Sequence, residues 1–313
     1  MPRADRAPAC ISSLHPLPPS ADTSDGSTAD PDRGHAACGR CSRGAGRLTG
    51  RLLWAVPLAI VVALVAWRAR ALTTSGAVAS AVVGACAVAA GWDWAILLVI
   101  YFATSTALSK FGAERKARRT ASVVAKSGPR DARQVLVNGG IFTVAAAVAL
   151  FFPLRMPLWH AIAAGALAAS SADTWATEIG TWLGGTPRSA WNWRRVAPGT
   201  SGGMTTAGTI AMIAGAAVLA IAVYGLEWGH GHAIATLLGG LSGAVADTVI
   251  GATLQERRRC LGCGEHTERF THNCGSRTRV ARGIAGLGND TVNLIATIVG
   301  SGIALWAAEL LGA

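Results

Sequence analysis

Residues 158–180, LWHAIAAGALAASSADTWATEIG, decide the fold class of this chain. The first half of the stretch is almost wholly apolar, and as a helix the stretch is long enough to cross a hydrocarbon core about 30 Å thick. Asp173 and Glu178 follow near its end. A carboxylate at the centre of a bilayer costs about 2.5–3.5 kcal/mol, so acidic residues in such segments usually face the interior of a helical bundle. We therefore interpret the stretch as a transmembrane helix that carries functional carboxylates at one end.

Similar apolar runs recur along the chain. Of its 313 residues, 51% are hydrophobic and only 14% are charged. We expect an all-α, polytopic integral membrane bundle of about seven to eight transmembrane helices in contact with the lipid bilayer. The expected segments lie near residues 52–67, 74–91, 93–109, 135–154, 157–180, 204–225, 232–254 and 287–308.

The first 50 residues have a different composition. They are rich in Pro, Ser, Gly, Asp and Arg and lack an apolar pattern that could pack. We expect a disordered leader over residues 1–50, followed by a helical membrane domain over residues 51–313.

The basic residues indicate an orientation. Of the 28 Lys and Arg residues, 18 lie in the loops 110–133, 184–203 and 256–282, and the connections between these loops carry almost no basic charge. The positive-inside rule places the three loops on the cytoplasmic side of a plasma or cytoplasmic membrane. The net charge of +11 is then a sign of topology and not of nucleic-acid binding. Counting back places Arg40 and Arg51 outside, so either segment 52–67 does not span or the charge rule is violated there.

Polar groups within the apolar segments converge on the same side. Asp173 and Glu178 lie at the inner end of their segment, Asp247 near the inner end of another, and Asp290 at the inner start of the last. Carboxylate, amide and hydroxyl oxygens are the ligands that Mg²⁺ prefers. We predict that these four carboxylates bind Mg²⁺, and that Asp173 is the leading ligand. Packing seams with interhelical hydrogen bonds are the alternative explanation for any single polar stripe.

Two of the acidic segments resemble each other. HAIAAGALAASSADTWATEIG from His160 is similar to HAIATLLGGLSGAVADTVIGATLQ from His232, and the tripeptide ADT recurs at Asp173 and Asp247. Both segments run from outside to inside in the expected topology, so the repeat is parallel. A pair of carboxylates related in this way suits a shared divalent metal, although coincidence in Ala-rich sequence would give the same pattern.

A glycine-rich stretch and basic residues border the same side. PGTSGG, residues 198–203, precedes an apolar run, and we expect its backbone N–H groups to bind phosphate at the start of that helix. Carboxylates, such a turn and basic groups are together what phosphoryl transfer requires. We assign catalytic roles to Asp173, Asp247, Asp290 and Lys110. The expected nucleotide- and phosphate-binding residues are Thr200, Ser201, Gly202, Gly203, Arg194, Arg195, Asn138, Asn289 and Asn293.

The third basic loop also contains metal-ligating residue types. Cys260 and Cys263 are followed by His272 and Cys274, which supplies the Cys₃His set of structural zinc sites. This pattern has two explanations: the four residues bind a structural zinc ion, or the loop is reduced and its thiols are incidental.

The motifs together resemble a known family. SSADTWATEIG, PGTSGGMTTAGT, GAVADTVIGATLQ, CLGCGEHTE with HNCG, GNDTVNLIAT, LSKFGAERK and RQVLVNGG are similar to motifs of the family that includes transmembrane protein 19 and phytyl-phosphate kinase. The resemblance covers about residues 52–311. It implies a kinase that converts an isoprenyl monophosphate to the diphosphate with CTP and Mg²⁺. Phytol and dolichol kinases are more distantly similar and have a lysine in the corresponding turn, which PGTSGG lacks.

Two other classes of protein remain as alternatives. A secondary transporter also uses intramembrane carboxylates and repeats, but it needs polar groups that continue to the opposite side. The outer halves of these segments are mostly Ala, Val, Leu and Ile, which favours an enzyme open to one side. A scaffold would leave the four carboxylates unexplained.

Overall fold

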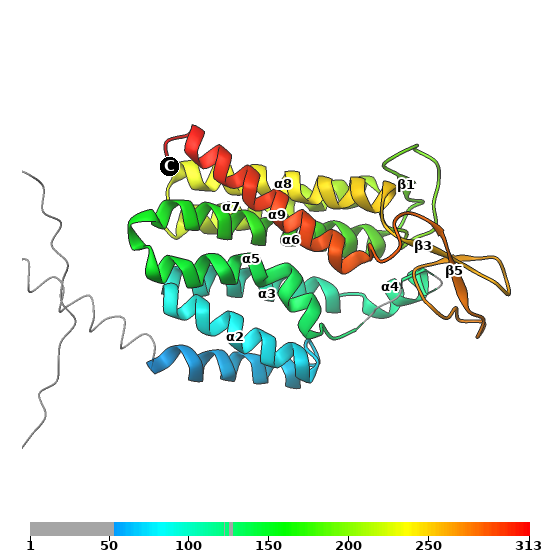
Figure 1. The fold of residues 1–313 in the computed structure, drawn as a ribbon, viewed down its shortest axis with the longest axis horizontal. Helices are drawn as coiled ribbons and strands as arrows, with labels where there is room; N and C mark the ends of the chain where they lie inside the picture. Colours follow the sequence, from blue (N-terminus) through cyan, green and yellow to red (C-terminus); the bar gives the residue numbers. More distant parts are fainter. Residues whose placement is uncertain (1–52, 122, 125–127) are drawn as a thin grey trace, which may run out of the picture. The chain divides into compact units, whose positions relative to one another are not determined.

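The computed structural model describes residues 53–121, 123–124 and 128–313. The predicted leader over residues 1–50 lies outside the described residues. The helices closely follow the predicted segments (Figure 1). A first helix, Leu53–Arg68, precedes α2 Thr74–Ala90, α3 Trp92–Lys110, α4 Ala113–Thr120, α5 Ala132–Phe151, α6 Met156–Leu183, α7 Thr206–Gly225, α8 His230–Thr253 and α9 Asn289–Leu310.

Side-chain caps explain where several helices begin. Thr73 caps α2, Thr205 caps α7, and Asp131 forms a capping box with Gln134 at the start of α5. Each cap accepts a hydrogen bond from a backbone N–H group that has no partner within the helix. Pro157 lies in the first turn of α6, where a backbone N–H would have no partner within the helix, so its missing donor costs no hydrogen bond.

Five of the described helices are long and apolar enough to cross a membrane: α3, α5, α7, α8 and α9. The helix Leu53–Arg68 and α2 are apolar but shorter. The helix α6 is the longest of the described helices but is absent from the five. The chain is therefore a multi-helix membrane protein, and the predicted count of seven to eight spans is not confirmed.

The helix α6 is at the centre of the packing. It contacts α3, α5, α7, α8 and α9, and nearly every residue from Ala161 to Ala172 is buried. Small residues make this possible: a Cβ added to Gly243 of α8 would lie 2.4 Å from the Cβ of Ala169. Ala and Gly allow such close approach between helices in lipid, where dispersion contacts and not the hydrophobic effect hold helices together.

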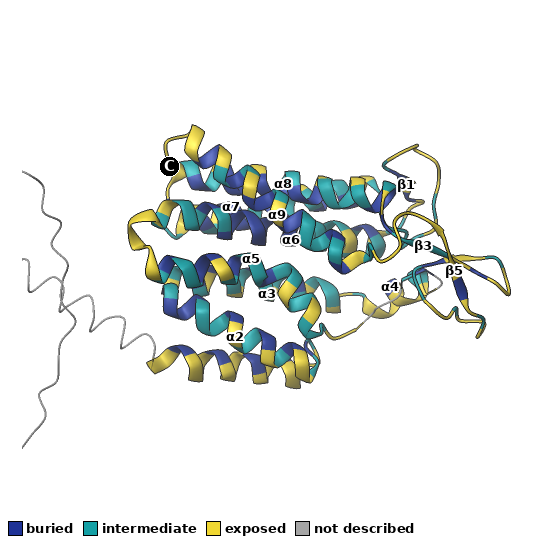
Figure 2. Cartoon of the chain, viewed as in Figure 1, coloured by how far each residue is buried: buried dark blue, intermediate teal, exposed yellow. Residues whose placement is uncertain are grey.

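The outer faces of the helices are apolar. Figure 2 shows buried residues between the helices and exposed residues on the outer faces. Ile210, Ile213 and Ile221 of α7 and Val78 and Val82 of α2 are examples of exposed aliphatic side chains. Contiguous exposed apolar surface of this extent indicates contact with lipid.

The fold is mostly helical, and its connecting loops also contain two small sheets. Strands β1 Arg188–Ser189 and β2 Gly203–Met204 pair antiparallel in the second basic loop. The third basic loop forms a three-stranded antiparallel sheet in the order β4–β3–β5, from β3 Arg257–Cys260, β4 His266–Thr267 and β5 Thr278–Arg282. Backbone groups in these polar loops have no helix to satisfy them, so they pair with each other.

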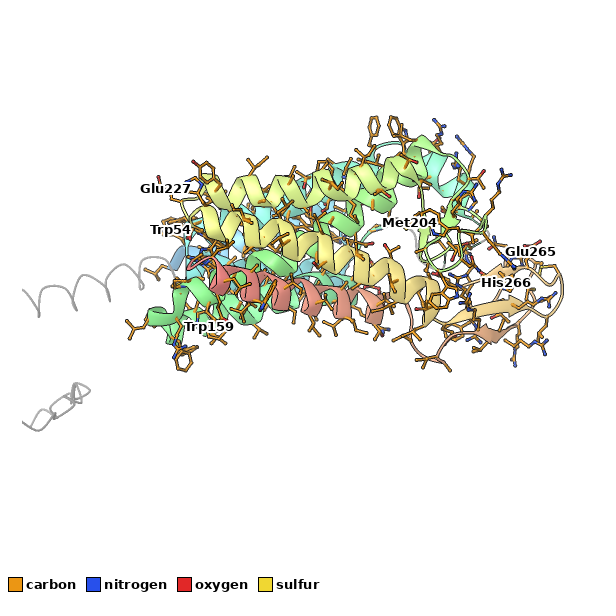
Figure 3. All side chains as sticks on the ribbon, turned by 90° about the horizontal axis from the view of Figure 1, so that it is seen from above. Trp54, Trp159, Met204, Glu227, Glu265 and His266 are labelled. Carbon is orange, nitrogen blue, oxygen red and sulfur yellow. The ribbon has the colours of Figure 1, made fainter. Side chains whose placement is uncertain are left out.

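The three basic loops lie together at one end of the helices. Figure 1 shows α4, β1, β3 and β5 at the same end, and in Figure 3 Met204 and His266 lie opposite Trp159 and Glu227. Hydrogen bonds join all three loops: Arg119 donates to the Gly185 carbonyl at 3.1 Å, and the Glu268 N–H donates to the Val123 carbonyl at 3.0 Å. The prediction that the basic loops share one side is confirmed. We call this the loop end.

Candidate functional site

The two repeated carboxylates meet at the loop end. Asp173 of α6 and Asp247 of α8 are close enough to interact electrostatically, and both residues are partly buried. At the other end of the same helices, the rings of His160 and His232 lie 6.0 Å apart. The residues that correspond in the two repeats are therefore neighbours at both ends of this helix pair.

Amide groups from α9 contact this carboxylate pair. Oriented to satisfy its hydrogen bonds, the Asn293 side-chain amide donates to Asp247 Oδ2 at 2.9 Å and to the Asn289 carbonyl at 3.3 Å. Asn293 thus holds one carboxylate oxygen of Asp247 in place. Two predicted site residues are in direct contact, and Asn289 takes part through its backbone.

A second polar group lies where α3, α5 and α6 meet. The Ser170 hydroxyl is within 3.1 Å of the Asn138 carbonyl oxygen and 3.3 Å of its side-chain oxygen. Tyr101 of α3 is buried near Ser170 and Asp173. Sequence reasoning missed Tyr101, which lies in the middle of an apolar run and carries no motif.

Asp290 lies in the first turn of α9 and pairs with a residue of α5. Its Oδ2 atom is 3.0 Å from Nε of Arg133. A carboxylate in the first turn is also favoured by the positive end of the helix dipole. Asp290 therefore has a protein partner in Arg133 whether or not a metal is present.

Glu178 has protein partners for both of its carboxylate oxygens. Oε1 accepts a hydrogen bond from Ser109 at 2.7 Å, and Oε2 lies 2.5 Å from the Lys116 ammonium. Lys116 also donates to the carbonyls of Leu108 and Ser109 at the end of α3. Sequence reasoning gave Lys116 no role, although it ends the motif LSKFGAERK, because its acidic partner lies on another helix. This geometry gives Glu178 a structural task, and its role as a metal ligand stays a prediction.

The four carboxylates do not form one compact ligand set. Among the described residues, the group of three or more acidic, Cys or His side chains with metal-ligand proximity is the Cys/His set alone. Asp290 and Glu178 are paired with Arg133 and Lys116. Asp173 interacts electrostatically with both Asp247 and Glu178, and no ion pair of Asp173 or Asp247 with a basic side chain is seen among the described residues. Lys110, a predicted catalytic residue, donates to the Ala69 carbonyl at 2.6 Å, and its catalytic role stays a prediction.

The glycine-rich turn does not open α7, which corrects the prediction. Strand β2 lies between the turn and the helix, and Thr205 caps α7 instead. The turn packs against the end of α8: Gly202 has φ +71°, and a Cβ there would lie 2.3 Å from the Ala252 nitrogen. The N–H of Gly203 donates to the Thr200 carbonyl within the turn. These close contacts explain the glycines without a ligand.

Ser201 of this turn enters a buried polar network. Its hydroxyl donates to Glu268 and accepts from Gln255 at 2.8 Å, and its carbonyl accepts from Arg257 at 2.6 Å. Glu268 also interacts electrostatically with Asp247, so the network reaches the carboxylate pair. Burial raises the pKa of the Glu268 carboxyl, and the Ser201 hydrogen bond and the Arg257 charge oppose that rise. Sequence reasoning missed Glu268 because it lies in the third basic loop, far from any apolar segment.

The predicted arginines of the second loop are at the surface. Arg194 and Arg195 are both exposed, as are the neighbouring Trp191 and Trp193. The Arg194 N–H is held by the Asn192 side chain at 3.2 Å, which shapes the loop. Their contact with a nucleotide stays a prediction.

The four residues of the Cys/His set lie together in the structure. One ligand atom from each of Cys260, Cys263, His272 and Cys274 lies within 4.8 Å of every other. Hydrogen bonds with His272 first, and then with Ser276 and Cys260, lower the pKa of the Cys274 thiol to about 6.

The end opposite the loops is more polar than the sequence indicated. Trp228 Nε1 donates to Asp93 Oδ2 at 2.8 Å, and the ring of His160 stacks on Trp228 at 3.8 Å. The expectation that this half of the bundle is nearly featureless is therefore wrong. Buried Ala and Leu residues of α6, from Ala163 to Ala169, lie between the two polar ends.

These features define a polytopic helical membrane protein with a polar centre at one end. The chain belongs to the family of integral membrane proteins described as DUF92, whose pattern matches residues 57–301.

Three relatives show how widely the sequence is shared. Protein PGR of Arabidopsis thaliana is 26% identical over 80% of this chain and 94% of its own length. The uncharacterized membrane protein MJ0933 of Methanocaldococcus jannaschii is 28% identical over 80% of this chain and 91% of its own. The uncharacterized membrane protein sll0875 of Synechocystis is 28% identical over 54% of this chain and 66% of its own. None of these names states an activity, and no solved structure matches the chain.

Proposed function

We propose that this protein is a membrane-embedded phosphotransferase that converts an isoprenyl monophosphate to the diphosphate, with CTP as donor and Mg²⁺ as cofactor. The observation that carries the proposal is the Asp173–Asp247 pair at the loop end of two helices, with the Asn293 amide on Asp247. The choice of CTP and of an isoprenyl acceptor comes from the motif resemblance described above.

The donor set suits Mg²⁺. This ion is usually held by one or two carboxylates together with substrate phosphates and water, and does not need a complete protein cage. Two adjacent carboxylates of which one is oriented by an amide fit that requirement. When bound, Mg²⁺ would neutralise charge on the nucleotide phosphates.

The reaction requires little proton transfer from the protein. The second pKa of a phosphate monoester is about 6, so the acceptor is already largely ionised at neutral pH. An acceptor oxygen attacks the γ-phosphorus of CTP, the bond to the bridging oxygen breaks, and CDP leaves with its electron pair. Catalysis is then mostly positioning and charge neutralisation. We place the lipid tail against the apolar outer faces and the phosphate at the loop end, on the cytoplasmic side.

The test is phosphoryl transfer by the purified full chain in detergent, with Mg²⁺, γ-labelled CTP and geranylgeranyl or phytyl monophosphate. We expect labelled isoprenyl diphosphate, and we expect Asp173→Asn and Asp247→Asn each to abolish its formation. Asp93→Asn, at the opposite end of the helices, is the matched control and should retain activity. A folded protein that transfers no label from CTP or ATP would refute the proposal.

Transport is the second candidate, because the Asp93, His160 and Trp228 group supplies polar residues at the opposite end. The packed Ala layer of α6 between the two ends argues against a continuous polar path. Proteoliposomes that accumulate an isoprenyl phosphate without forming a diphosphate would favour the transporter.

A further inference from the structure

The Cys/His set has the dimensions of a tetrahedral metal site. Zinc–sulfur bonds of about 2.3 Å and zinc–nitrogen bonds of about 2.0 Å place the ligand atoms of a tetrahedron roughly 3.5–3.8 Å apart. The Sγ atoms of Cys263 and Cys274 are 3.8 Å apart, and those of Cys260 and Cys274 are 3.4 Å apart. His272 Nδ1 lies 3.3 Å from the Cys263 sulfur and 3.2 Å from the Cys274 sulfur.

Two tight turns present these ligands. In the first turn the Gly264 N–H donates to the Cys260 carbonyl, and Gly264 has φ +77°. In the second turn the Gly275 N–H donates to the His272 carbonyl, and Gly275 has φ +83°. Each turn therefore ends on a glycine in a conformation that other residues avoid. Each turn also contributes two ligands to the same point.

The sheet that carries the turns contacts both other basic loops through one segment. Just after β4, the Glu268 carboxylate bonds Ser201 of the second loop and its N–H bonds the Val123 carbonyl of the first. Arg269 donates to the Val124 carbonyl at 2.9 Å, and Asn273 donates to the Ala121 carbonyl at 2.9 Å. Residues 267–271 lie between the two ligand turns and Asn273 lies within the second, so fixing the turns fixes this segment.

We propose that Cys260, Cys263, His272 and Cys274 bind one structural Zn²⁺ ion that locks residues 267–273 against the other two basic loops. The ion closes a sheet too small to have a hydrophobic core of its own, a role that structural zinc commonly has. The proposal does not depend on the phosphotransferase, because it rests on ligand geometry and on contacts between loops.

The first measurement is the metal content of the full chain, purified in detergent without added chelator. We expect one zinc per chain, and near-total loss of it in Cys263→Ser and in Cys274→Ser. Cys86→Ser is the matched control, because Cys86 is a partly buried thiol on α2 outside the set. It should retain the full zinc content. Absence of zinc from the folded chain, or iron in its place, would overturn the proposal.

The second measurement separates bound metal from incidental thiols. Cobalt exchanged into the site should give the intense visible absorption of tetrahedral coordination together with a thiolate charge-transfer band. Both should vanish in Cys274→Ser and persist in Cys86→Ser. A cobalt spectrum typical of six-coordinate oxygen ligands, or a Cys–Cys disulfide in the purified chain, would contradict the assignment.

The third measurement tests the locking role. Removing zinc with a chelator should speed trypsin cleavage within 256–282, which contains seven arginines. Cleavage after Arg68 and Arg70, outside the basic loops, should be unchanged. If the zinc-loaded and zinc-free chains are cleaved in 256–282 at the same rate, the ion does not lock the loops.

Discussion

Lys116 and Glu178 form an ion pair at 2.5 Å that joins the first basic loop to the last turns of α6, and the two side chains are only 9% and 22% exposed. The pair explains a carboxylate that the sequence alone made a candidate metal ligand. Removing one partner leaves an uncompensated charge in a poorly hydrated place, which costs more than the intact pair contributes.

We therefore expect Glu178→Ala to lower the free energy of unfolding by about 3 kcal/mol, at the low end of the range for buried pairs because Glu178 keeps some exposure. Thermal unfolding in detergent measures the change. Glu114→Ala is the control. Glu114 pairs with Arg118 at 3.8 Å, but its side chain is 91% exposed, so its removal should have no measurable effect on stability. Equal stability of the two variants would show that the Lys116–Glu178 pair is not structural.

The glycine-rich turn predicts a backbone effect. Gly202→Ala places a Cβ 2.3 Å from the Ala252 nitrogen as well as in an unfavourable φ region. Gly185 has φ +96° and open space around it, so Gly185→Ala carries the conformational cost alone, about 1–2 kcal/mol. We expect Gly202→Ala to be clearly more destabilising in the same unfolding measurement. A Gly202 variant no worse than the Gly185 variant would mean that the turn does not press on α8.

Asn293 gives a prediction for Mg²⁺ affinity. If Asp247 is a Mg²⁺ ligand, the Asn293 amide is the group that orients it. Loss of such a hydrogen-bond partner usually weakens metal binding, so the Mg²⁺ concentration for half-maximal activity should rise by about 10–100-fold. A titration of phosphoryl transfer by Asn293→Ala measures this. Asn192→Ala, in the exposed second loop, should leave the titration unchanged. An Asn293 variant with reduced stability and an unaltered Mg²⁺ requirement would point to a packing role only.

Glu268 and Glu256 should give opposite pH dependences of stability. Burial raises the pKa of Glu268, so the folded chain binds this proton more tightly than the unfolded chain does. The destabilisation from ionising Glu268 is absent at low pH and grows as pH rises from about 4.5 through the folded pKa. Glu268→Gln replaces the carboxyl with a neutral amide that does not ionise. The stability of this variant relative to the unaltered chain should therefore increase with pH over that window. Asp247 and Arg257 are the charges that face Glu268, and both are retained.

For Glu256 the sign is reversed. The Gly286 N–H donates to Oε2 at 2.5 Å and is the main cause that lowers the pKa of this carboxyl, with help from Arg258. Its contribution to stability is complete above about pH 4.5 and is lost as pH falls through the folded pKa. Glu256→Gln should therefore lose stability at neutral pH and approach the unaltered chain in acid. Parallel pH profiles for the two variants would contradict both assignments.

The sequence by itself determined the helical segments and the side on which the polar groups gather. Apolar runs between basic loops leave little choice in a bilayer, because backbone groups must be satisfied within each helix and Lys and Arg stay on one side. It also indicated the Cys/His set, since four ligand residues in a short loop can be brought together by local turns alone.

Only the tertiary structure decided which polar residues are partners. Asp173 meets Asp247 because small residues let α6 and α8 approach closely, whereas Glu178 turns to Lys116 and Asp290 to Arg133. Lys116 and Glu268 end two of the motifs that carry the family resemblance, and Tyr101 lies in an apolar run. The sequence assigned none of them a role, because their roles depend on contacts between segments far apart in the chain. Spacing along one helix tells which face a carboxylate occupies, but its neighbour on that face is chosen by how the helices and loops pack.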